Sequence, residues 1–240
     1  MTGPVSTIVA TNIATNIAST AITIAIQSTN QHPQNDSKIS LRPATSHDIE
    51  AVWQMWKIIM EQQIYFPYTT EMHSESFIKE EWVHLRHPMY VACLDILIVD
   101  QEDSNDCDTT TSRTTHPTAT KLKTTTRALP QTIVVGAFIL RPNQPGYGSH
   151  ICNAAYLVHH EHRRRGIGHL LTAQSIQTAR NIGYRGMQFN LVLHTNTAAV
   201  TLWHTYGFSI VGTIPGGFYL QAQDRYVDCF IYFKSLLLDE

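Results

Sequence analysis

The sequence predicts one α+β domain over residues 38–237, and three observations support this prediction. Apolar runs of strand length alternate with stretches in which apolar residues recur at helical spacing. These segments follow the order strand, two helices, consecutive strands, and a final β-α-β crossover. The apolar fraction of 43% over 240 residues is ordinary and suffices for one sizeable core.

Low-complexity segments precede and interrupt this domain. Residues 1–37 are rich in Thr, Asn, Ile, Ala and Ser, and their first charged side chain is Asp36. Thr and Asn are poor helix formers, so we expect a disordered or loosely helical tail there. Residues from about 101 to 131 form a polar insertion, with ten Thr between residues 109 and 126. We expect this insertion to be a disordered connection between two hairpin strands.

The first half of the domain is predicted to hold strands on either side of a helical pair. The first helix has apolar residues at helical spacing and can be capped by Thr45 or Ser46, while Pro43 ends the strand before it. In order, the expected elements are a strand over 38–42, a helix over about 48–63, a helix over 74–85, a strand over 89–99 and a strand over 132–140.

The second half alternates strands and helices before ending in a hairpin. Glycines follow both expected helices, which is typical of helix C-termini. In order, the expected elements are a strand over 149–158, a helix over 167–182, a strand over 187–193, a helix over 196–206, and strands over 208–214 and 226–233 joined by Pro215-Gly216-Gly217.

A basic, glycine-containing loop connects the expected strand 149–158 to the helix that follows it. The loop reads His-Arg-Arg-Arg-Gly-Ile-Gly over residues 162–168. Helix N-termini offer unpaired N–H groups and partial positive charge, and the two glycines allow close approach of a ligand. The loop is therefore suited to a pyrophosphate, although seven such residues also occur as a basic surface loop before an ordinary helix.

Two motifs in this order resemble the GCN5-related N-acetyltransferases (GNAT). The first family motif is R/Q-x-x-G-x-G/A and the second, after a helix and a strand, is N-x-x-A-x-x-L-aromatic-x-x-x-G-F. Their matches in this chain are Arg163, Gly166 and Gly168, and then Asn196, Ala199, Leu202, Trp203, Gly207 and Phe208. The resemblance implies the α/β GNAT fold: a mixed, mostly antiparallel twisted sheet of about six to seven strands flanked by about four helices, with the fourth and fifth strands splayed apart.

The same resemblance implies acetyl-CoA as co-substrate. In this family the pantetheine arm pairs with the fourth strand like an added strand, and the loop holds the pyrophosphate. Carried over residue by residue, the donor site comprises Tyr156, Leu157 and Val158 for the pantetheine, Arg163, Arg164, Arg165, Gly166, Ile167 and Gly168 for the pyrophosphate, and Asn196 and Trp203 along the cofactor.

The general acid departs from the family pattern. Many members have a Tyr at the position of Trp203, and its hydroxyl protonates the leaving thiolate. Trp203 lacks such a hydroxyl, so Tyr206, three residues further along the same expected helix, is the candidate catalytic acid. The thiolate can also leave unprotonated, and because no carboxylate stands out as a base, a water relay is the alternative.

Two asparagines occupy expected strands, where Asn is disfavoured. Asn153 lies in the strand 149–158 and Asn190 in the strand 187–193. Either a bulge, a structural hydrogen bond or substrate binding explains such a residue. Residues of about 130–235 also resemble the fungal proline-analogue N-acetyltransferases, which act on azetidine-2-carboxylate. That likeness implies a catalytic and substrate-binding role for Asn153 and substrate binding by Asn190 with the backbone beside Leu191.

The sequence leaves the acceptor and the assembly open. The first hypothesis is acetyl transfer to a small amino or imino acid. The alternatives are a protein or polyamine acetyltransferase and a non-catalytic module that binds acetyl-CoA. The oligomeric state stays open, with a homodimer as the assembly considered. The histidines of 159–162 suggest a metal, but we expect none, because neighbouring histidines on a short loop are not expected to face one ion together.

Composition excludes several partners. The net charge of −2 argues against nucleic-acid binding. No run reaches the ~18 apolar residues of a membrane span, and no signal peptide or presequence is recognised at the N-terminus. Cys93, Cys152 and Cys229 lie in apolar runs and are expected to be buried free thiols. We therefore expect the protein in the cytoplasm, with the nucleus as an additional location that stays open.

Overall fold

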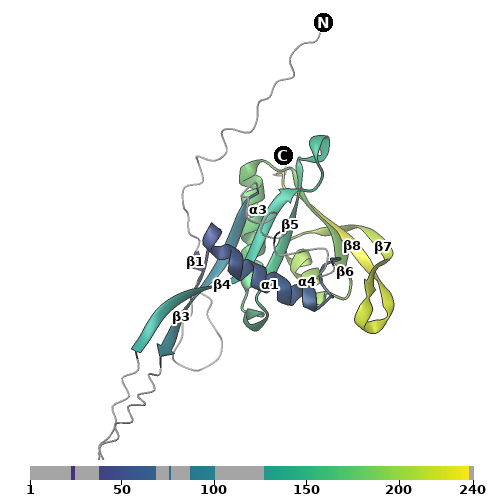
Figure 1. Cartoon of the computed structure of the whole chain (residues 1–240). Coiled ribbons are helices and arrows are strands. Elements are labelled where there is room, and N and C mark those ends of the chain that lie inside the picture. The colour runs from purple at the N-terminus through teal and green to yellow at the C-terminus, as the bar shows by residue number, and fades with distance from the viewer. Residues whose placement is uncertain (1–22, 25–37, 69–75, 77–86, 101–126, 238–240) are drawn as a thin grey trace, which may run out of the picture.

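The computed structural model describes residues 23–24, 38–68, 76, 87–100 and 127–237 (Figure 1). Apart from residues 23–24 and 76, the expected N-terminal tail and the helix expected over 74–85 lie outside these residues. Residues 101–126, which make up most of the Thr-rich insertion, also lie outside the described residues. Within the described part, no helix is long and apolar enough to cross a membrane.

One twisted, mixed sheet forms the centre of the molecule. Its strand order is β1-β2-β3-β4-β5-β6-β8-β7, and every neighbouring pair is antiparallel except the parallel pair β5–β6. Because β1 has only two residues, the sheet has the size that the GNAT resemblance implies. The bounds are β1 Thr23–Ile24, β2 Ile39–Pro43, β3 Met89–Asp100, β4 Arg127–Pro142, β5 Ile151–Val158, β6 Gly186–Leu193, β7 Ser209–Leu220 and β8 Arg225–Ser235.

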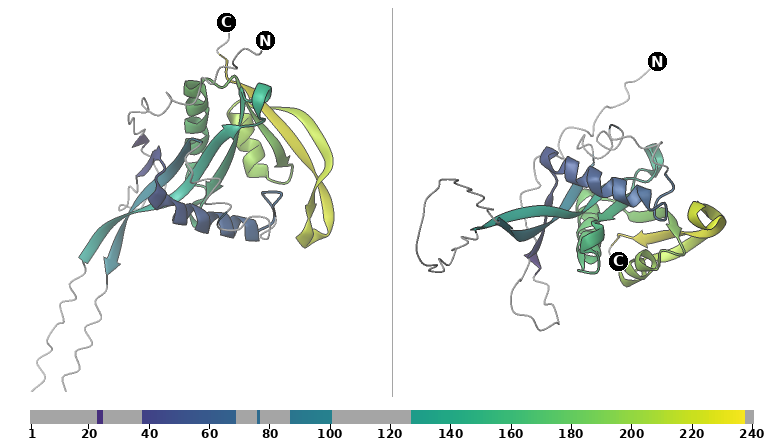
Figure 2. Two further views of the ribbon diagram at one scale, coloured as in Figure 1. Left: turned by 45° about the horizontal axis from the view of Figure 1, so that its top comes forward. Right: turned by 60° about the horizontal axis from the view of Figure 1, so that its bottom comes forward.

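Three α-helices among the described residues cover the two faces of the sheet. Figure 2 shows α1 (Ile49–Glu61) on one face and α3 (Ile167–Ile182) on the other. Alternate residues of β4 serve the two cores: Ala137 and Ile139 pack with α1, and Phe138 and Leu140 pack with α3. The short helix α4 (Thr197–Thr205) joins the α3 side through its residue Trp203. The expected helix 167–182 is confirmed to the residue, and it lies between two glycines, Gly166 and Gly183, that have positive φ.

The parallel strands β5 and β6 separate soon after they meet. They pair only at Ile151 with Gly186 and at Cys152 with Met187. On its other side β5 stays paired with β4 over its whole remaining length. The predicted splay of the fourth and fifth long strands is therefore confirmed, and no strand of the described residues pairs with the edge of β5 that faces β6 beyond Cys152.

Two strand boundaries differ from the expectation by five residues or more. Strand β4 begins at Arg127, so residues 127–131 pair with β3 and are not part of the insertion. Strand β7 continues through Pro215-Gly216-Gly217, and the hairpin turn lies instead at Gln221–Gln223. The ladder between β7 and β8 shifts register between Ile214 and Phe218. The Pro-Gly-Gly segment therefore forms a bulge within one long strand, which glycine and an edge position permit.

A carboxylate at the start of α1 ties the first long strand to that helix. Both oxygens of Asp48 accept from the Arg42 guanidinium at 2.7 Å, and Oδ2 also accepts from the backbone N–H and hydroxyl of Thr45. Of the two capping residues that the sequence allowed, Thr45 and Ser46, the structure shows Thr45 at the cap position. Burial of Asp48 raises its pKa, but the hydrogen bonds from Arg42 and Thr45 outweigh burial and leave the pKa lowered overall.

Candidate active site

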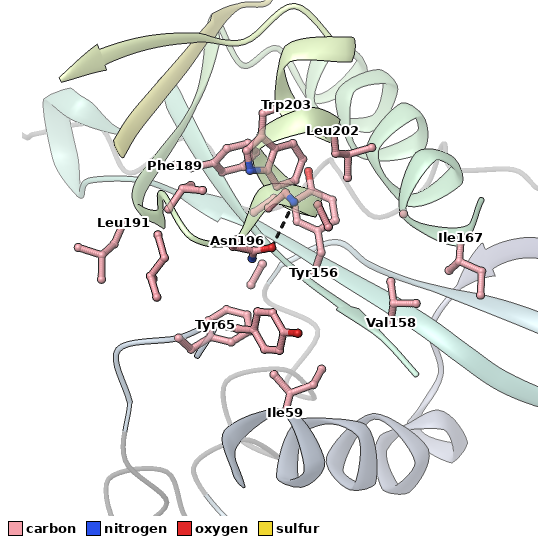
Figure 3. A pocket seen from close by; sticks show the side chains of 18 of the residues that line it. Ile59, Tyr65, Tyr156, Val158, Ile167, Phe189, Leu191, Asn196, Leu202 and Trp203 are labelled. Carbon is pink, nitrogen blue, oxygen red and sulfur yellow. Dashed lines mark hydrogen bonds between the residues drawn. The ribbon is translucent and has the colours of Figure 1, made fainter. Parts of the chain in front are cut away.

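A cavity of about 930 Å³ lies where β5 and β6 separate. Figure 3 shows Tyr156 and Val158 of β5, Phe189 and Leu191 of β6, and Trp203 of α4 around it. Ile59 and Tyr65 border it from the α1 side (Figure 3). Elements from both halves of the domain therefore build one cavity, as expected for a ligand site between diverging strands.

The wall formed by β5 includes residues from both faces of the strand. Asn153, Tyr156 and Val158 line the cavity, whereas Leu157 does not, because its side chain is fully buried in the core beneath α1. The Tyr156 hydroxyl lies 2.7 Å from Ser175 Oγ, so the hydroxyl end of this side chain is buried under α3 while its ring borders the cavity. Burial raises the Tyr156 pKa. A neutral phenol held in this way supports the wall but is a poor proton source.

The predicted pyrophosphate loop lies at one end of the cavity. Arg164 and Gly166 both have positive φ, of 62° and 75°, and they turn the chain from β5 into α3. Arg163, Arg164, Gly166, Ile167 and Gly168 line the cavity, whereas Arg165 is exposed and does not. A Cβ atom added at Gly168 would lie 3.5 Å from Leu202 Cδ2, which is ordinary contact. The N-terminal N–H groups of α3 therefore border the space with little side-chain cover.

Arg163 links this loop to the chain that follows α1. Its Nη1 donates to the Tyr65 hydroxyl at 3.1 Å and its Nη2 donates to Gln62 Oε1 at 3.3 Å. The guanidinium carbon lies 5.2 Å from the centre of the Tyr65 ring. The sequence did not reveal Tyr65 as a site residue, nor Trp56, Phe66 and Tyr68, which line the cavity with it.

The second GNAT-like motif places a cap and an aromatic side chain on the opposite wall. Asn196 Oδ1 accepts from the backbone N–H of Ala199 at 3.2 Å and so caps α4, as predicted. The Trp203 ring packs on Phe189, with centroids 4.3 Å apart, and on Tyr156 at 5.2 Å. Trp203 is thus mainly a packing residue of the wall at the position where many family members carry a Tyr.

Tyr206 is not brought to the cavity. Helix α4 ends at Thr205, and the Tyr206 hydroxyl donates to the backbone carbonyl of His169 at 2.8 Å. Its side chain does not line the cavity, and burial raises its pKa. Tyr206, the predicted catalytic acid, is therefore not placed in the cavity, because it lies beyond the end of α4 and turns toward α3.

Three asparagines meet at the other end of the cavity. Asn143 Oδ1 accepts from Asn190 Nδ2 at 2.7 Å and from Asn153 Nδ2 at 3.2 Å. Asn153 and Asn190 line the cavity. The hydrogen-bonded ladder from β6 to β8 skips Asn190 and Leu191, which form a bulge. Asn190 therefore both belongs to a bulge and lines the cavity, two explanations that the sequence had offered as alternatives. Asn143 was not among the site residues expected from the sequence.

The charged side chains that line the cavity are all basic among the described residues. They are Arg141, Arg163 and Arg164, and no Asp or Glu is present in this lining. The cavity thus offers positive charge at the α3 end and at the asparagine end. A ligand with a carboxylate or a phosphate is favoured over a polycation.

The loop before Arg163 brings together possible metal ligands. One ligand atom each of His159, Glu161 and His162 lie within 4.8 Å of one another. Two of the three histidines, His159 and His162, thus come together with Glu161, because residues three apart in a 3-10 turn lie on one side, whereas His160 is not in this group. The three arginines that follow oppose the binding of a further cation there.

Comparisons with known proteins agree with this geometry. Residues 100–208 match the model of the Acetyltransferase (GNAT) family. A GCN5-related N-acetyltransferase from Kribbella flavida superimposes with a TM-score of 0.63 and 25% identity, covering 82% of this chain and 97% of that one. The structure of yncA from Salmonella typhimurium, solved with its cofactor acetyl-CoA, has a TM-score of 0.60 and 15% identity over 84% of this chain and 96% of its own.

A curated relative adds sequence likeness. The N-acetyltransferase aca1 of Schizosaccharomyces pombe is 40% identical over 102 residues, which cover 42% of this chain and 49% of the relative. The chain therefore spans about half the length of the curated relative that it matches. The chain has the GNAT fold. The family model, the aca1 relative and the Kribbella flavida structure support an acyltransferase.

Proposed function

We propose that the protein transfers the acetyl group of acetyl-CoA to the amine of a small amino or imino acid. One observation carries this proposal: a single cavity between splayed strands joins a loop suited to pyrophosphate at one end to a cluster of asparagine amides at the other. Such a cavity can hold a donor and an acceptor in one line, which is the main requirement for acyl transfer.

The donor end fits an anionic cofactor. The N–H groups at the start of α3 are not covered by side chains at Gly166 and Gly168, and Arg164 adds a permanent positive charge beside them. The free edge of β5 offers backbone groups to the amides of a pantetheine arm. Acetyl-CoA supplies the acetyl group as a reactive thioester.

The residues of this chain act mainly by positioning. Asn153 at the edge of the splay can accept an N–H of the acceptor amine, and backbone N–H groups of β5 can donate to the oxygen that becomes negative in the transition state. No carboxylate lines the described cavity, so water is the candidate base. The thiolate leaves without a proton from Trp203, whose indole N–H is not acidic.

The acceptor class follows from charge and shape. Arg141 and the unpaired bulge at Asn190 and Leu191 offer partners for a carboxylate. The aromatic side chains of Trp56, Tyr65 and Phe66 form an apolar wall suited to a compact ring or short aliphatic body. A proline analogue such as azetidine-2-carboxylate has both features. A polyamine has no carboxylate and carries only positive charge.

The decisive experiment measures free thiol release from acetyl-CoA with one acceptor at a time. The acceptors are azetidine-2-carboxylate, cis-4-hydroxyproline, proline, spermidine and a peptide with a free amine. We expect turnover with at least one of the cyclic imino acids and none with spermidine. Turnover with spermidine or the peptide alone would refute the proposed acceptor, and binding of acetyl-CoA without turnover of any acceptor would favour a non-catalytic module.

A further inference from the structure

Asn143 lies outside the cavity lining and yet contacts two residues that are in it. Its side-chain oxygen accepts from Asn153 on β5 and from Asn190 on β6, the two strands that separate at this point. Its own backbone N–H donates to the carbonyl of Ile151 at 2.8 Å, which fixes Asn143 to the start of β5. One side chain therefore bridges the splay where β5 and β6 no longer pair with each other.

The hydrogen bonds fix how the amides in this group point relative to one another. A carbonyl oxygen has two lone pairs, and both lone pairs of Asn143 Oδ1 are used by amide donors. Asn153 must then turn its NH₂ group to Asn143, which leaves Asn153 Oδ1 without a partner among the described residues. A free amide oxygen at the cavity accepts hydrogen bonds and so recognises an N–H group of a ligand.

Asn190 is held at both ends. Its Nδ2 donates to Asn143 and its Oδ1 accepts from Gln188 Nε2 at 2.9 Å. Little of this side chain is left for a ligand, so its contribution lies in the backbone of the bulge that it shares with Leu191. The two cavity asparagines therefore differ in function: Asn153 offers an acceptor to an amine, and Asn190 shapes backbone donors for a carboxylate.

We propose that Asn143 is the positioning residue of the acceptor site, which fixes the amide direction of Asn153 and the bulge at Asn190 together. This inference rests on the proposed function, because it assigns the amine and the carboxylate of the acceptor to these two groups. It makes Asn143 a residue that acts through others without touching the substrate.

The first test needs no turnover. The side-chain NH₂ resonances of Asn153 and Asn190 are assigned in a ¹⁵N-labelled protein and compared between the unmutated chain and Asn143→Ala. We expect both NH₂ groups to shift together. The matched control is Asn181→Ala, which removes an amide pair with Gln177 on the exposed side of α3 and should leave both resonances in place. Unmoved resonances in folded Asn143→Ala would overturn the bridging role.

The second test separates positioning from simple structural damage. Asn143→Ala should lower kcat for the imino acid about tenfold, the loss expected for two neutral hydrogen bonds, with unchanged KM for acetyl-CoA. Asn143→Asp keeps an oxygen acceptor for both donors, so kcat should recover, while its negative charge near a carboxylate should raise KM for the imino acid. Equal loss of kcat in the Ala and Asp variants would overturn the inference.

The third test is a double-mutant cycle. If Asn143 acts through Asn153, adding Asn143→Ala to Asn153→Ala should cause little further loss of kcat. Fully additive losses would show that Asn143 acts independently and would refute the positioning role. If the resonances shift but no acceptor is acetylated, the proposed function fails. Asn143 is then a structural bridge alone, and its role in positioning the acceptor is refuted although the bridge itself exists.

Discussion

Arg163 and Tyr65 are 98 residues apart in sequence, and the guanidinium of the first donates to the hydroxyl of the second at 3.1 Å. This contact joins the loop that would hold the pyrophosphate to the aromatic wall of the acceptor end. A charge-assisted hydrogen bond and a cation–π contact therefore link the two ends of the cavity. Because both contacts require a defined geometry, they hold Arg163 and Tyr65 in fixed relative positions.

The first prediction concerns this contact. Tyr65→Phe keeps the ring beneath Arg163 but removes the hydroxyl, so it should lower kcat/KM for the acceptor about threefold to tenfold, as expected for one hydrogen bond. The shift in melting temperature caused by acetyl-CoA should stay as in the unmutated protein. Steady-state kinetics and thermal melts measure the two effects. A larger loss on the donor side than on the acceptor side would contradict the assignment of Tyr65.

The second prediction concerns the start of α3. Gly168→Asp adds negative charge beside the proposed phosphate site and should abolish the rise in melting temperature that acetyl-CoA causes by mass action. Gly168→Ala is the matched control, because its Cβ would make only ordinary contact with Leu202 at 3.5 Å. The Ala variant should retain most of the shift. If the folded Asp variant shows the full rise in melting temperature with acetyl-CoA, the assignment of the pyrophosphate to this loop is wrong.

The third prediction concerns the two cavity asparagines. Asn153→Ala should lower kcat, because its amide oxygen holds the amine in line and positioning matters most in the transition state. Asn190→Ala should act mainly through KM for the imino acid, because it loosens the bulge beside Leu191. We expect losses of about tenfold to a hundredfold in kcat/KM. Both variants should bind acetyl-CoA normally, and the reverse split between kcat and KM would exchange their roles.

The fourth prediction concerns Trp203. If this residue only packs, Trp203→Phe should keep kcat within about threefold while lowering the free energy of unfolding by about 1–2 kcal/mol, through lost contact with Phe189 and Phe208. Chemical denaturation and kinetics measure the two quantities. A fall in kcat of a hundredfold or more in a folded variant would show that the indole takes part in the chemistry.

The fifth prediction concerns Asp48 and pH. Because hydrogen bonds lower the pKa of folded Asp48, its ionised form stabilises the fold at neutral pH, and this contribution is lost as pH falls below about 4 and through the folded pKa. Asp48→Asn should therefore cost about 1–3 kcal/mol of unfolding free energy at pH 7 and much less at acidic pH. Asp95→Asn, which affects only an exposed bond to Thr132, is the control.

Local patterns were sufficient where the structure depends on neighbours in sequence. The bounds of α3 followed from the glycines at 166 and 183, and Asn196 was recognised as a cap from its place before a helix. The splay of β5 and β6 followed from the resemblance. The glycines and the cap are encoded within about a turn of the chain, so local sequence was enough to place them.

Tertiary contacts account for what was missed. Tyr65 contacts Arg163, which lies 98 residues further along the chain. Asn143 reaches Asn153 because the register of β4 and β5 pairs Arg141 with Asn153. Spacing alone put Tyr206 near Trp203, but it could not show that α4 ends between them. The Pro-Gly-Gly segment has the composition of a turn, and only pairing with β8 makes it a bulge.

The bulge in β7 also bears on how the molecule behaves in a crowded solution. Strand β7 is the last in the sheet, and Ile210 and Val211 on it are 41% and 59% exposed, so its outer edge is a potential template for another chain. Pro215 has no N–H to donate, and the register shift breaks the ladder in the middle of the strand. Both features oppose edge-to-edge association of β7 with the strands of other molecules. Replacing Pro215 with a β-branched residue should therefore make the protein more prone to aggregate.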